Sequence, residues 1–432
     1  MKFLLSCILF MLILPGYLFP QEYWIRQPSP TNRWFIQSAF TDTLNGWVAG
    51  DSGVIIHTSN GGLTWVTQNS GLDIPLSNIF FLNKRLGWSI ANHLIYPSSI
   101  ILKTTDGGNN WTSTPYEDTL TMLSTIMFLD SMTGFIGGQW GTILKTTDAG
   151  HNWNRCEIDT GVYANRTINK FVFYNYQYGF AGGGIMDAGG VVWKTTDFGL
   201  HWNSQYVSPE PVDDMLLIDS QTAIGSGGDF ELGLGIVKTN NAGLSWDYYQ
   251  LLVFGIGYSI SSRTKNDIWV ALGYGSHWMR TLDTGKTYQP IPVPDTCGIY
   301  DVNFIDSMHG WAFGTYGAIY KFNTSTIGIH QLSSNVPGQF MLYQNYPNPF
   351  NPATKIKFDI PDFPEIKGVR GMSIRLTIFD ILGHEIATLV NTQLQPGTYE
   401  IGWNGINFPS GIYFYRLTTE DFSESKRMVL IK

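Results

Sequence analysis

The string KTTDGGNNW, which begins at Lys103, restricts the fold most, because altered copies of it recur along the chain. The copies begin at His57, Lys103, Lys145, Lys194, Lys238 and Arg280. Their spacing of about 40 to 50 residues is typical of a β-propeller, in which every repeat supplies one four-stranded blade of a closed ring. The repeat therefore predicts an all-β architecture and leaves the function open.

The composition of the 432 residues agrees with this reading and restricts the partners. Glycine is abundant, with 47 residues, and aromatic residues make up 15% of the chain. Charged residues make up 14%, well below the ~25% of a typical soluble domain. The formal net charge of -8 is unsuited to a polyanion, so nucleic acid is not expected as a partner.

Two patterns count the blades. A step from a small or apolar residue to an aromatic or apolar one occurs at Gly46-Trp47, Gly87-Trp88, Gly134-Phe135, Gly179-Phe180, Ala223-Ile224, Ile268-Trp269 and Gly310-Trp311. The repeated string ends in Trp65, Trp111, Trp153, Trp202, Trp246 and Tyr288, and Trp24 near the N-terminus supplies a seventh aromatic residue. We expect an N-terminal strand to complete the last blade, since closure removes an exposed sheet edge. The prediction is seven blades, with six as the alternative.

The polar residue within each copy has a structural explanation. These residues are Asn60, Asp106, Asp148, Asp197, Asn241 and Asp283. Their side chains can accept hydrogen bonds from backbone N–H groups of a tight turn, and the glycine two positions later allows a positive φ. Because there is one such residue per blade, they lie too far apart to share an ion. We expect no metal site and no cofactor.

The chain divides into four segments. Lys2 precedes an apolar run over residues 3–14, shorter than the ~18 residues of a membrane span, so residues 1–20 are expected to be a signal peptide. Residues 21–322 form the propeller, and residues 323–339 are typical of a linker. Residues 340–432 predict a small immunoglobulin-like β-sandwich, because short alternating strands are separated by proline and glycine turns. Beyond the signal peptide only Cys156 and Cys297 occur, in different repeats, and we expect both to be free.

The repeat resembles the Asp-box, or BNR repeat, of sialidases, sortilin-type receptors and the photosystem II stability/assembly factor family. The blade-wide pattern over residues 23–322 is most similar to the last of these. In these families the box is a structural turn remote from the ligand, so the resemblance implies a fold and leaves the activity open.

The C-terminal segment resembles the type A sorting domain of the type IX secretion system of Bacteroidetes. The resemblance rests on Pro347, Asn348, Pro349, Phe350, Gly411, Tyr413, Lys426 and Lys432, with the phrases around them. It implies contact with the type IX secretion machinery, and a sortase-like peptidase that removes the domain and attaches the remainder to surface lipopolysaccharide. The expected location is the cell surface or the medium, reached through the periplasm and the outer membrane.

Binding is expected on the face opposite the Asp-box turns, where the hairpins between the second and third strands carry different residues in each repeat. The candidate ligand-binding residues are Asp51, Tyr96, Trp140, Asp229, His277, Trp278 and Tyr316. We expect a monomeric, noncatalytic propeller that binds a protein or a carbohydrate.

No catalytic residue is assigned. A sialidase needs three arginines that clamp a carboxylate and a tyrosine paired with a glutamate, and the Arg-Ile-Pro signature of that class is absent. Two alternatives stay open: a secreted glycoside hydrolase of the Asp-box propeller type, and an assembly or stability factor for an extracytoplasmic complex.

Overall fold

The computed structural model describes residues 23–93, 98–323, 329–333, 335–362, 372–405 and 408–432. The expected signal peptide and Tyr96 lie outside these ranges. Within them the regular elements are strands, apart from two short 3-10 turns, η1 (Asp51–Gly53) and η2 (Thr315–Gly317). No helix of this described part is long and apolar enough to cross a membrane. The all-β prediction is confirmed.

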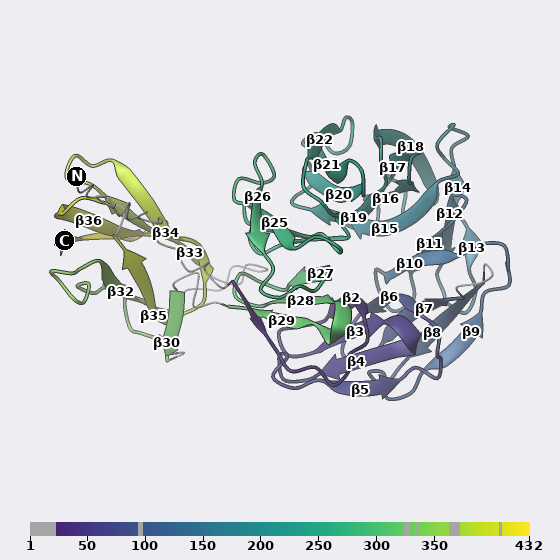
Figure 1. Ribbon diagram of the computed structural model, residues 1–432, viewed down its shortest axis with the longest axis horizontal. Coiled ribbons are helices and arrows are strands. Elements are labelled where there is room, and N and C mark those ends of the chain that lie inside the picture. The colour runs from purple at the N-terminus through teal and green to yellow at the C-terminus, as the bar shows by residue number, and fades with distance from the viewer. Residues whose placement is uncertain (1–22, 94–97, 324–328, 334, 363–371, 406–407) are drawn as a thin grey trace, which may run out of the picture.

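The repeats form seven sheets arranged as a ring (Figure 1). The first three sheets contain β2 (Phe35–Phe40), β3 (Gly46–Gly50), β4 (Val54–Thr58) and β5 (Val66–Asn69); β6 (Leu76–Phe81), β7 (Gly87–Asn92), β8 (Ser99–Thr104) and β9 (Thr112–Pro115); and β10 (Leu123–Phe128), β11 (Gly134–Gly138), β12 (Thr142–Thr146) and β13 (Asn154–Arg155). The fourth contains β15 (Thr167–Phe173), β16 (Gly179–Ile185), β17 (Gly189–Thr195) and β18 (His201–Ser208), with β14 (Glu157–Ile158) added in parallel to β18.

The remaining sheets of the ring follow the same antiparallel order. They contain β19 (Val212–Leu217), β20 (Ala223–Asp229), β21 (Gly233–Thr239) and β22 (Asp247–Leu251); β23 (Ser259–Ser262), β24 (Ile268–Ala271), β25 (His277–Thr281) and β26 (Gln289–Pro292); and β27 (Ile299–Phe304), β28 (Gly310–Gly314) and β29 (Ile319–Phe322) with β1 (Trp24–Arg26). In the last sheet β1 pairs antiparallel with β29, with Trp24 opposite Phe322.

The innermost strands close the ring. Neighbouring sheets contact each other in the order β2, β6, β10, β15, β19, β23 and β27, and β27 contacts β2 again. The ring therefore contains seven sheets in the described residues, and β1 from the N-terminal part of the chain is the outer strand of the last one.

Stacked rings explain the step from glycine to an aromatic residue. Trp47 stacks on Phe81 of the next sheet with centroids 3.7 Å apart, and Trp88 stacks on Phe128 at 3.6 Å. The glycine before the aromatic residue is required by a close approach, since a Cβ at Gly46 would lie 2.2 Å from the Phe40 ring. The motif thus joins successive blades through buried aromatic area.

The Asp-box turns have the predicted chemistry. In all six copies the side-chain oxygen of the polar residue accepts a hydrogen bond from the backbone N–H four residues later, at 2.9 to 3.0 Å. The six predicted glycines have φ between 73° and 86°. The bond from the Asn152 N–H, together with neighbouring bonds, lowers the pKa of Asp148 to about 2. The oxygens of these residues are thus bonded within their own turns.

Two further residues of the box have roles that the sequence did not indicate. The threonine hydroxyl donates to the polar residue and accepts from the glycine N–H, as Thr146 does with Asp148 at 2.8 Å and Gly150 at 2.9 Å. The lysine that begins the string donates to a carbonyl in the box of the next blade; Lys145 reaches the Phe198 oxygen at 2.7 Å. Lys321 bonds the Gly61 oxygen at 2.8 Å and so links the last blade to the first.

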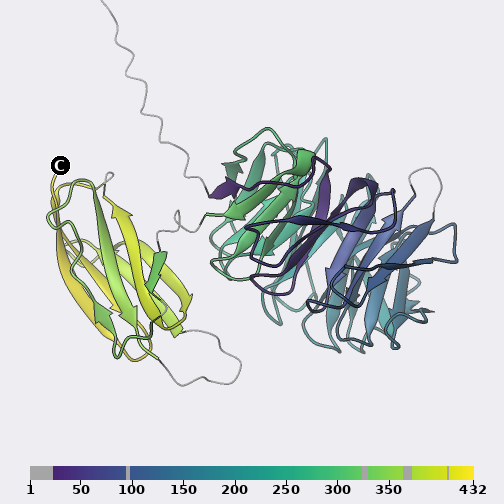
Figure 2. The same cartoon turned by 90° about the horizontal axis from the view of Figure 1, so that it is seen from below.

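The C-terminal segment is a β-sandwich (Figure 2). One sheet has the order β30 (Ile329–Ser333), β35 (Gly397–Asn404), β32 (Ala353–Ile360), β31 (Met341–Leu342), and the other β34 (Glu385–Leu394), β33 (Met372–Phe379), β36 (Gly411–Thr418), β37 (Ser423–Leu430). Phe358 and Ile401 of the first sheet share one core with Leu376 and Tyr415 of the second. The immunoglobulin-like topology stays a prediction.

One boundary differs from expectation. β30 lies inside the segment 323–339 that was expected to be a linker, and it pairs with β35 of the sandwich. The linker prediction rested on the Ser and Thr content of this segment. Composition does not reveal that a strand here pairs with β35, which lies much later in the sequence. Cys156 and Cys297 are free, as expected, and burial raises the pKa of Cys156 to about 11.

Candidate functional site

The two ends of the ring carry different connections. The Asp-box turns and the turns between the first and second strands of each sheet share one end, here called the Asp-box face. The hairpins between the second and third strands, with tips at Ser52, Trp140, Asp187 and Tyr316, lie at the other end, the hairpin face. The innermost strands also begin at the hairpin face, because strand direction alternates.

A recurring irregularity at the start of the innermost strands builds the site. In six sheets the pairing with the second strand shifts by one residue near the start of the innermost strand, after the second pair in β15 and after the first pair in the other five. The residues skipped by the register are Ile36, Ser77, Ser124, Asn169, Asp213 and Tyr300. A bulge re-aims side chains, and all six residues line a cavity in the centre of the ring.

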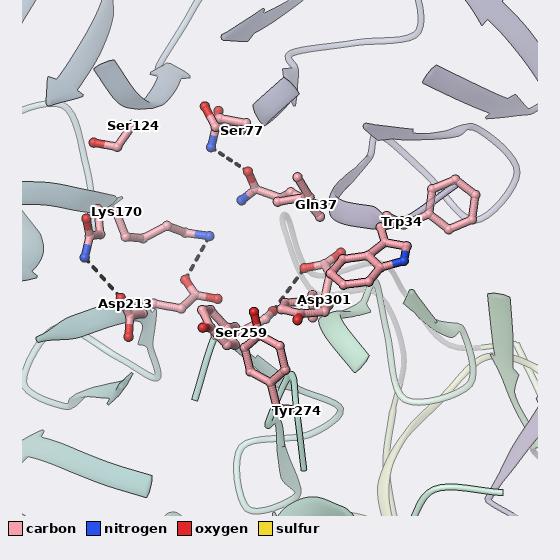
Figure 3. A pocket seen from close by; sticks show the side chains of 16 residues that line it. Trp34, Gln37, Ser77, Ser124, Lys170, Asp213, Ser259, Tyr274 and Asp301 are labelled. Carbon is pink, nitrogen blue, oxygen red and sulfur yellow. Dashed lines mark hydrogen bonds and ion pairs between the residues drawn. The ribbon is translucent and has the colours of Figure 1, made fainter. Parts of the chain in front are cut away.

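This central cavity has a volume of about 390 Å³ and opens at the hairpin face. Figure 3 shows Trp34, Tyr274, Asp301, Lys170 and Asp213 arranged around it. Its residues come from all seven sheets, so no single repeat contains the site.

One wall of the cavity is aromatic. Trp34 stacks on Tyr300 at 6.3 Å between centroids, and Tyr300 contacts Tyr258 at 5.1 Å and Tyr274 at 5.5 Å. Trp34 is 39% exposed and Tyr274 50% exposed, so their faces are accessible. Asp51 holds Trp34 in place by accepting its backbone N–H at 3.1 Å. These rings form a continuous apolar surface over the first, sixth and seventh sheets.

The opposite wall is polar, and most of its groups are already bonded. Lys170 forms an ion pair with Asp214 at 2.9 Å, and Asp214 also accepts the backbone N–H groups of Met215 at 2.8 Å and Ile260 at 2.9 Å. Burial lowers the pKa of Lys170, but the charge of Asp214 and its hydrogen bond outweigh burial, so the pKa is raised overall. Asp214 therefore fastens the fifth sheet to the fourth and the sixth.

Asp301 has a comparable structural role. Its Oδ2 accepts the backbone N–H of Ser38 at 2.9 Å and the Ser38 hydroxyl, and its Oδ1 accepts the Ser259 hydroxyl at 3.0 Å. Burial raises the pKa of Asp301 to about 6, although the hydrogen bonds from Ser38 act in the opposite direction. Asp301 thus joins the seventh sheet to the first and the sixth.

Asp213 differs from these two acids. Its Oδ1 accepts a hydrogen bond from Asn169 Nδ2 at 3.2 Å, and no other residue of the described chain bonds Oδ2. Burial, together with the neighbouring Asp214, raises the pKa of Asp213 to about 7. Asp213 is the carboxyl group of the cavity with capacity left for a ligand.

The predicted binding residues fall into four groups, of which the first three are exposed residues, half-buried residues and one residue outside the described ranges. Trp140 and Tyr316 are 61% and 66% exposed at hairpin tips, and Tyr316 contacts Trp34 at 6.2 Å between centroids. Asp51 and His277 are half-buried at the same face, and the His277 ring bonds the Ser276 hydroxyl at 2.9 Å. Tyr96 lies outside the described residues.

Trp278 and Asp229 do not offer an exposed surface. The prediction for Trp278 needs correction, because its ring is fully buried and stacks on Trp24 at 5.3 Å. It belongs to β25 and not to the hairpin tip, which ends before His277. Asp229 is buried at the end of β20, where it accepts the Leu232 N–H.

Three acids at this face could hold a cation. One ligand oxygen each of Asp187, Glu210 and Asp229 lies within 4.8 Å of the others. Glu210 Oε2 also accepts the Asp187 N–H at 3.0 Å, and burial raises the pKa of Glu210. The acids were not predicted as a group, because they come from two hairpins and a connection between sheets.

Sequence reasoning missed the central cavity itself. Its bulge residues follow a buried apolar residue and precede a polar one, as in Leu76-Ser77-Asn78 and Val212-Asp213-Asp214. In five of the six bulges two consecutive polar or aromatic residues break the strand alternation, and this recurring break was the available signal.

The sorting-motif residues are adjacent in the sandwich. Phe350 is buried, and its backbone bonds Val429 and Ile431 on either side of Leu430. Asn348 accepts the Val429 N–H at 2.9 Å, while Pro347 and Pro349 flank it in the same loop. The remaining residues lie close to the C-terminal strand: Gly411 opposite Leu430, Tyr413 opposite Met428, Lys426 in β37, and Lys432, whose N–H bonds Ser410 at 2.9 Å. The motif therefore anchors the end of the chain.

The fold and the two motifs define the class: an Asp-box β-propeller joined to a C-terminal sandwich. Residues 19–122 match the family model described as photosynthesis system II assembly factor YCF48, and residues 344–432 match that of the secretion system C-terminal sorting domain. The chain thus combines a YCF48-like propeller with a sorting domain, and it is exported by type IX secretion to the cell surface or the medium.

Solved structures agree on the fold. The chain is similar to YCF48 bound to D1 peptide, with 20% identity and a TM-score of 0.56 over 69% of this chain and 96% of that one. For YCF48 from Cyanidioschyzon merolae the values are 18%, 0.55, 70% and 99%. For an ancestral GH74 enzyme they are 13%, 0.51, 91% and 59%. No curated protein matches the chain.

Proposed function

We propose that this exported propeller binds a segment of a partner protein in the central cavity of its hairpin face, without catalysis. The observation that carries the proposal is the composition of the cavity: an aromatic wall faces polar groups across about 390 Å³. Aromatic faces bind the apolar parts of a ligand, and a few polar groups fix its orientation. This combination is usual in ligand-binding sites.

The rim supports a protein partner. Trp140 and Tyr316 are exposed aromatic residues with φ of 57° and 56°. Aromatic residues in these positions suit the anchoring contacts of an interface.

Related propellers are compatible with either kind of ligand. One similar structure is titled as YCF48 bound to a D1 peptide, and another is a GH74 enzyme. A peptide segment agrees with the polar groups deep in the cavity, and a carbohydrate stacked on Trp34 is the other outcome of the test. The role of an assembly factor would be one use of the same peptide site.

The cavity favours binding over hydrolysis. A glycoside hydrolase needs two carboxyl groups free to act on the substrate. Asp214 and Asp301 accept hydrogen bonds at both oxygens from neighbouring sheets, which leaves Asp213 without a second reactive acid in the cavity lining. Turnover of polysaccharides by the protein would contradict this proposal.

The test compares retention of ligands on peptide and glycan arrays by the full-length protein and three variants. We expect Trp34→Ala and Trp140→Ala to lose the retained ligand. Phe198→Ala is a matched control, because Phe198 is 52% exposed with φ of 65° in an Asp-box turn on the other face. Retention that is unchanged in both cavity-side variants, with melting temperatures also unchanged, would refute the proposal.

A further inference from the structure

The charges that line the central cavity are not balanced. The lining contains three carboxyl groups, Asp213, Asp214 and Asp301, and one ammonium group, Lys170. Lys170 is paired with Asp214, which leaves the other two acids without a cationic partner in the lining. When these acids are ionised, the cavity has a negative charge that a positive ligand would neutralise.

The aromatic wall has the same preference. Tyr258, Tyr274 and Tyr300 contact one another, and Trp34 extends the wall from Tyr300. Aromatic faces attract a cation within about 6 Å of the ring centroid, and a cluster of several rings is the usual receptor for an ammonium group. A neutral ligand would use only the apolar area of this wall.

Asp213 lies where both features meet. It comes close enough to Tyr258 to help raise the pKa of that phenol, after burial and Tyr274, which are the larger causes. Asp213 lines the cavity, its Oδ1 is bonded to Asn169, and its Oδ2 has no bonding partner among the described residues. A single free oxygen suits a point-like ammonium better than a guanidinium, which binds a carboxylate best through both oxygens.

We infer that the cavity receives the ammonium group of a lysine side chain from the partner peptide, held between Asp213 and the tyrosine wall. This inference rests on the proposed function and adds the chemistry of the ligand. The aliphatic stem of the lysine would lie along Trp34, since such stems pack on apolar surface while the charged end finds its partner.

The charged groups around Asp213 give the inference a pH dependence. Asp213 must lose its proton to pair with the lysine, and its pKa is about 7. Asp301 adds a smaller contribution from its pKa of about 6, while Lys170 keeps its charge because Asp214 raises its pKa overall. Burial raises the pKa values of Tyr258 and Tyr300, so both stay neutral, and Tyr274 completes the set of titratable groups facing the cavity. Affinity should therefore rise between pH 6 and pH 8.

The experiment measures binding of small probes to the full-length protein by NMR titration. The probes are Nα-acetyl-lysine N-methylamide, its Nε-acetylated analogue without the charge, and Nα-acetyl-arginine N-methylamide. We expect the lysine probe to bind at least about 10-fold more tightly than the neutral analogue, and more tightly than the arginine probe.

Two variants separate the acid from general charge effects. Asp213→Asn should weaken the lysine probe about 10-fold and remove most of its pH dependence. Asp106→Asn removes the same charge on the Asp-box face, where Asn60 and Asn241 occupy the equivalent position, and should leave the affinity unchanged. Tyr274→Leu should weaken the lysine probe several-fold more than the neutral analogue.

Equal affinity for the charged and neutral probes, or no effect of Asp213→Asn, would overturn the inference. The array experiment distinguishes this failure from that of the proposed function. A neutral ligand that is retained and then lost in Trp34→Ala would leave the binding cavity in place and refute only the lysine. Preference for arginine would likewise refute the single-oxygen argument.

Discussion

The two faces of the ring are made from the same repeats, yet their polar side chains differ in how fully they are hydrogen-bonded within the protein. On the Asp-box face, each acid or amide accepts the hydrogen bonds of its own turn, and Lys145 and its equivalents fasten one blade to the next. On the hairpin face, one oxygen of Asp213 has no bonding partner among the described residues, and Trp140 is 61% exposed. Repetition without variation indicates a structural role, and a polar group with unused hydrogen-bonding capacity indicates a place for a ligand.

Two aspartates make the comparison measurable, because their pKa values move in opposite directions. Asp267, in the turn before β24 on the Asp-box face, is buried between Arg263 and Arg280. Burial raises the pKa of Asp267, but the hydrogen bond from Arg280 and the charge of Arg263 together have a larger effect in the opposite direction. The pKa of Asp267 is therefore lowered overall. Asp213 on the hairpin face has its pKa raised. Stability should depend on pH with opposite signs at the two sites.

The largest effect is expected for Asp267→Asn. This variant leaves Arg263 and Arg280 without their buried counter-ion, which costs about 3 kcal/mol or more at pH 7. Because the folded pKa of Asp267 is lowered, its stabilisation is present above the unfolded pKa of about 3.9 and is lost as the pH falls through the folded value. Urea unfolding of both proteins at pH 7 and pH 3 checks this. A gap that is as large at pH 3 as at pH 7 would contradict the ion-pair explanation.

The second effect compares two threonines on one strand. Thr146, at the Asp-box end of β12, bonds Asp148 and Gly150, whereas the Thr142 hydroxyl at the other end is buried and has no hydrogen-bond partner in the described chain. Thr146→Val should lower the free energy of unfolding by about 1 kcal/mol, because it leaves the partly buried Gly150 N–H unpaired. Thr142→Val should be neutral or stabilising.

Both threonine variants are measured by urea unfolding under the same conditions. The side-chain volumes match, so the difference isolates the hydrogen bonds. Equal losses in the two variants would show that packing, and not bonding within the box, explains the repeated threonine.

The third effect has the opposite sign. In Asp213→Asn the carboxyl group that resists ionisation is gone, so the variant should be more stable than the natural protein at pH 8, by on the order of 1 kcal/mol. Between the unfolded pKa of about 3.9 and the folded pKa of about 7, the folded state holds a proton that the unfolded state has lost, so stability falls as the pH rises. At pH 3.5 the two proteins should melt at similar temperatures. Destabilisation by this variant at pH 8 would mean that Asp213 is a structural residue like Asp214.

The Asp-box face could be predicted in detail because its interactions are local. Thr104, Asp106 and Gly108 act within one turn, so the spacing in the sequence already contains the geometry. The closing role of Trp24 could also be predicted, since the last repeat lacks the terminal aromatic residue that the N-terminus supplies.

The hairpin face could be predicted only in part. The exposed tips at Trp140 and Tyr316 follow from alternation of strands, but the aromatic wall joins Trp34, Tyr258 and Tyr300 from three sheets, and no local spacing contains that arrangement. Trp278 was misplaced because its hairpin is longer than in most of the other repeats, which shifts the tryptophan into a strand and into the core. The repeated sequence therefore does not predict contacts between residues of different sheets, nor the length of each hairpin.

The smallest effect on stability, and the sharpest test of the comparison, is expected for Trp140→Gly. Trp140 is exposed and has a positive φ that glycine adopts without strain, so the free energy of unfolding should change by no more than about 0.5 kcal/mol in either direction. Phe198→Gly makes the same change in an Asp-box turn, and both are measured by thermal melting alongside ligand retention. If the hairpin face is the binding face, only Trp140→Gly loses the ligand while both proteins stay folded. An exposed tryptophan with a positive φ is not expected to stabilise the fold. Loss of stability in Trp140→Gly would therefore show that Trp140 has a structural role and is not a ligand-binding residue.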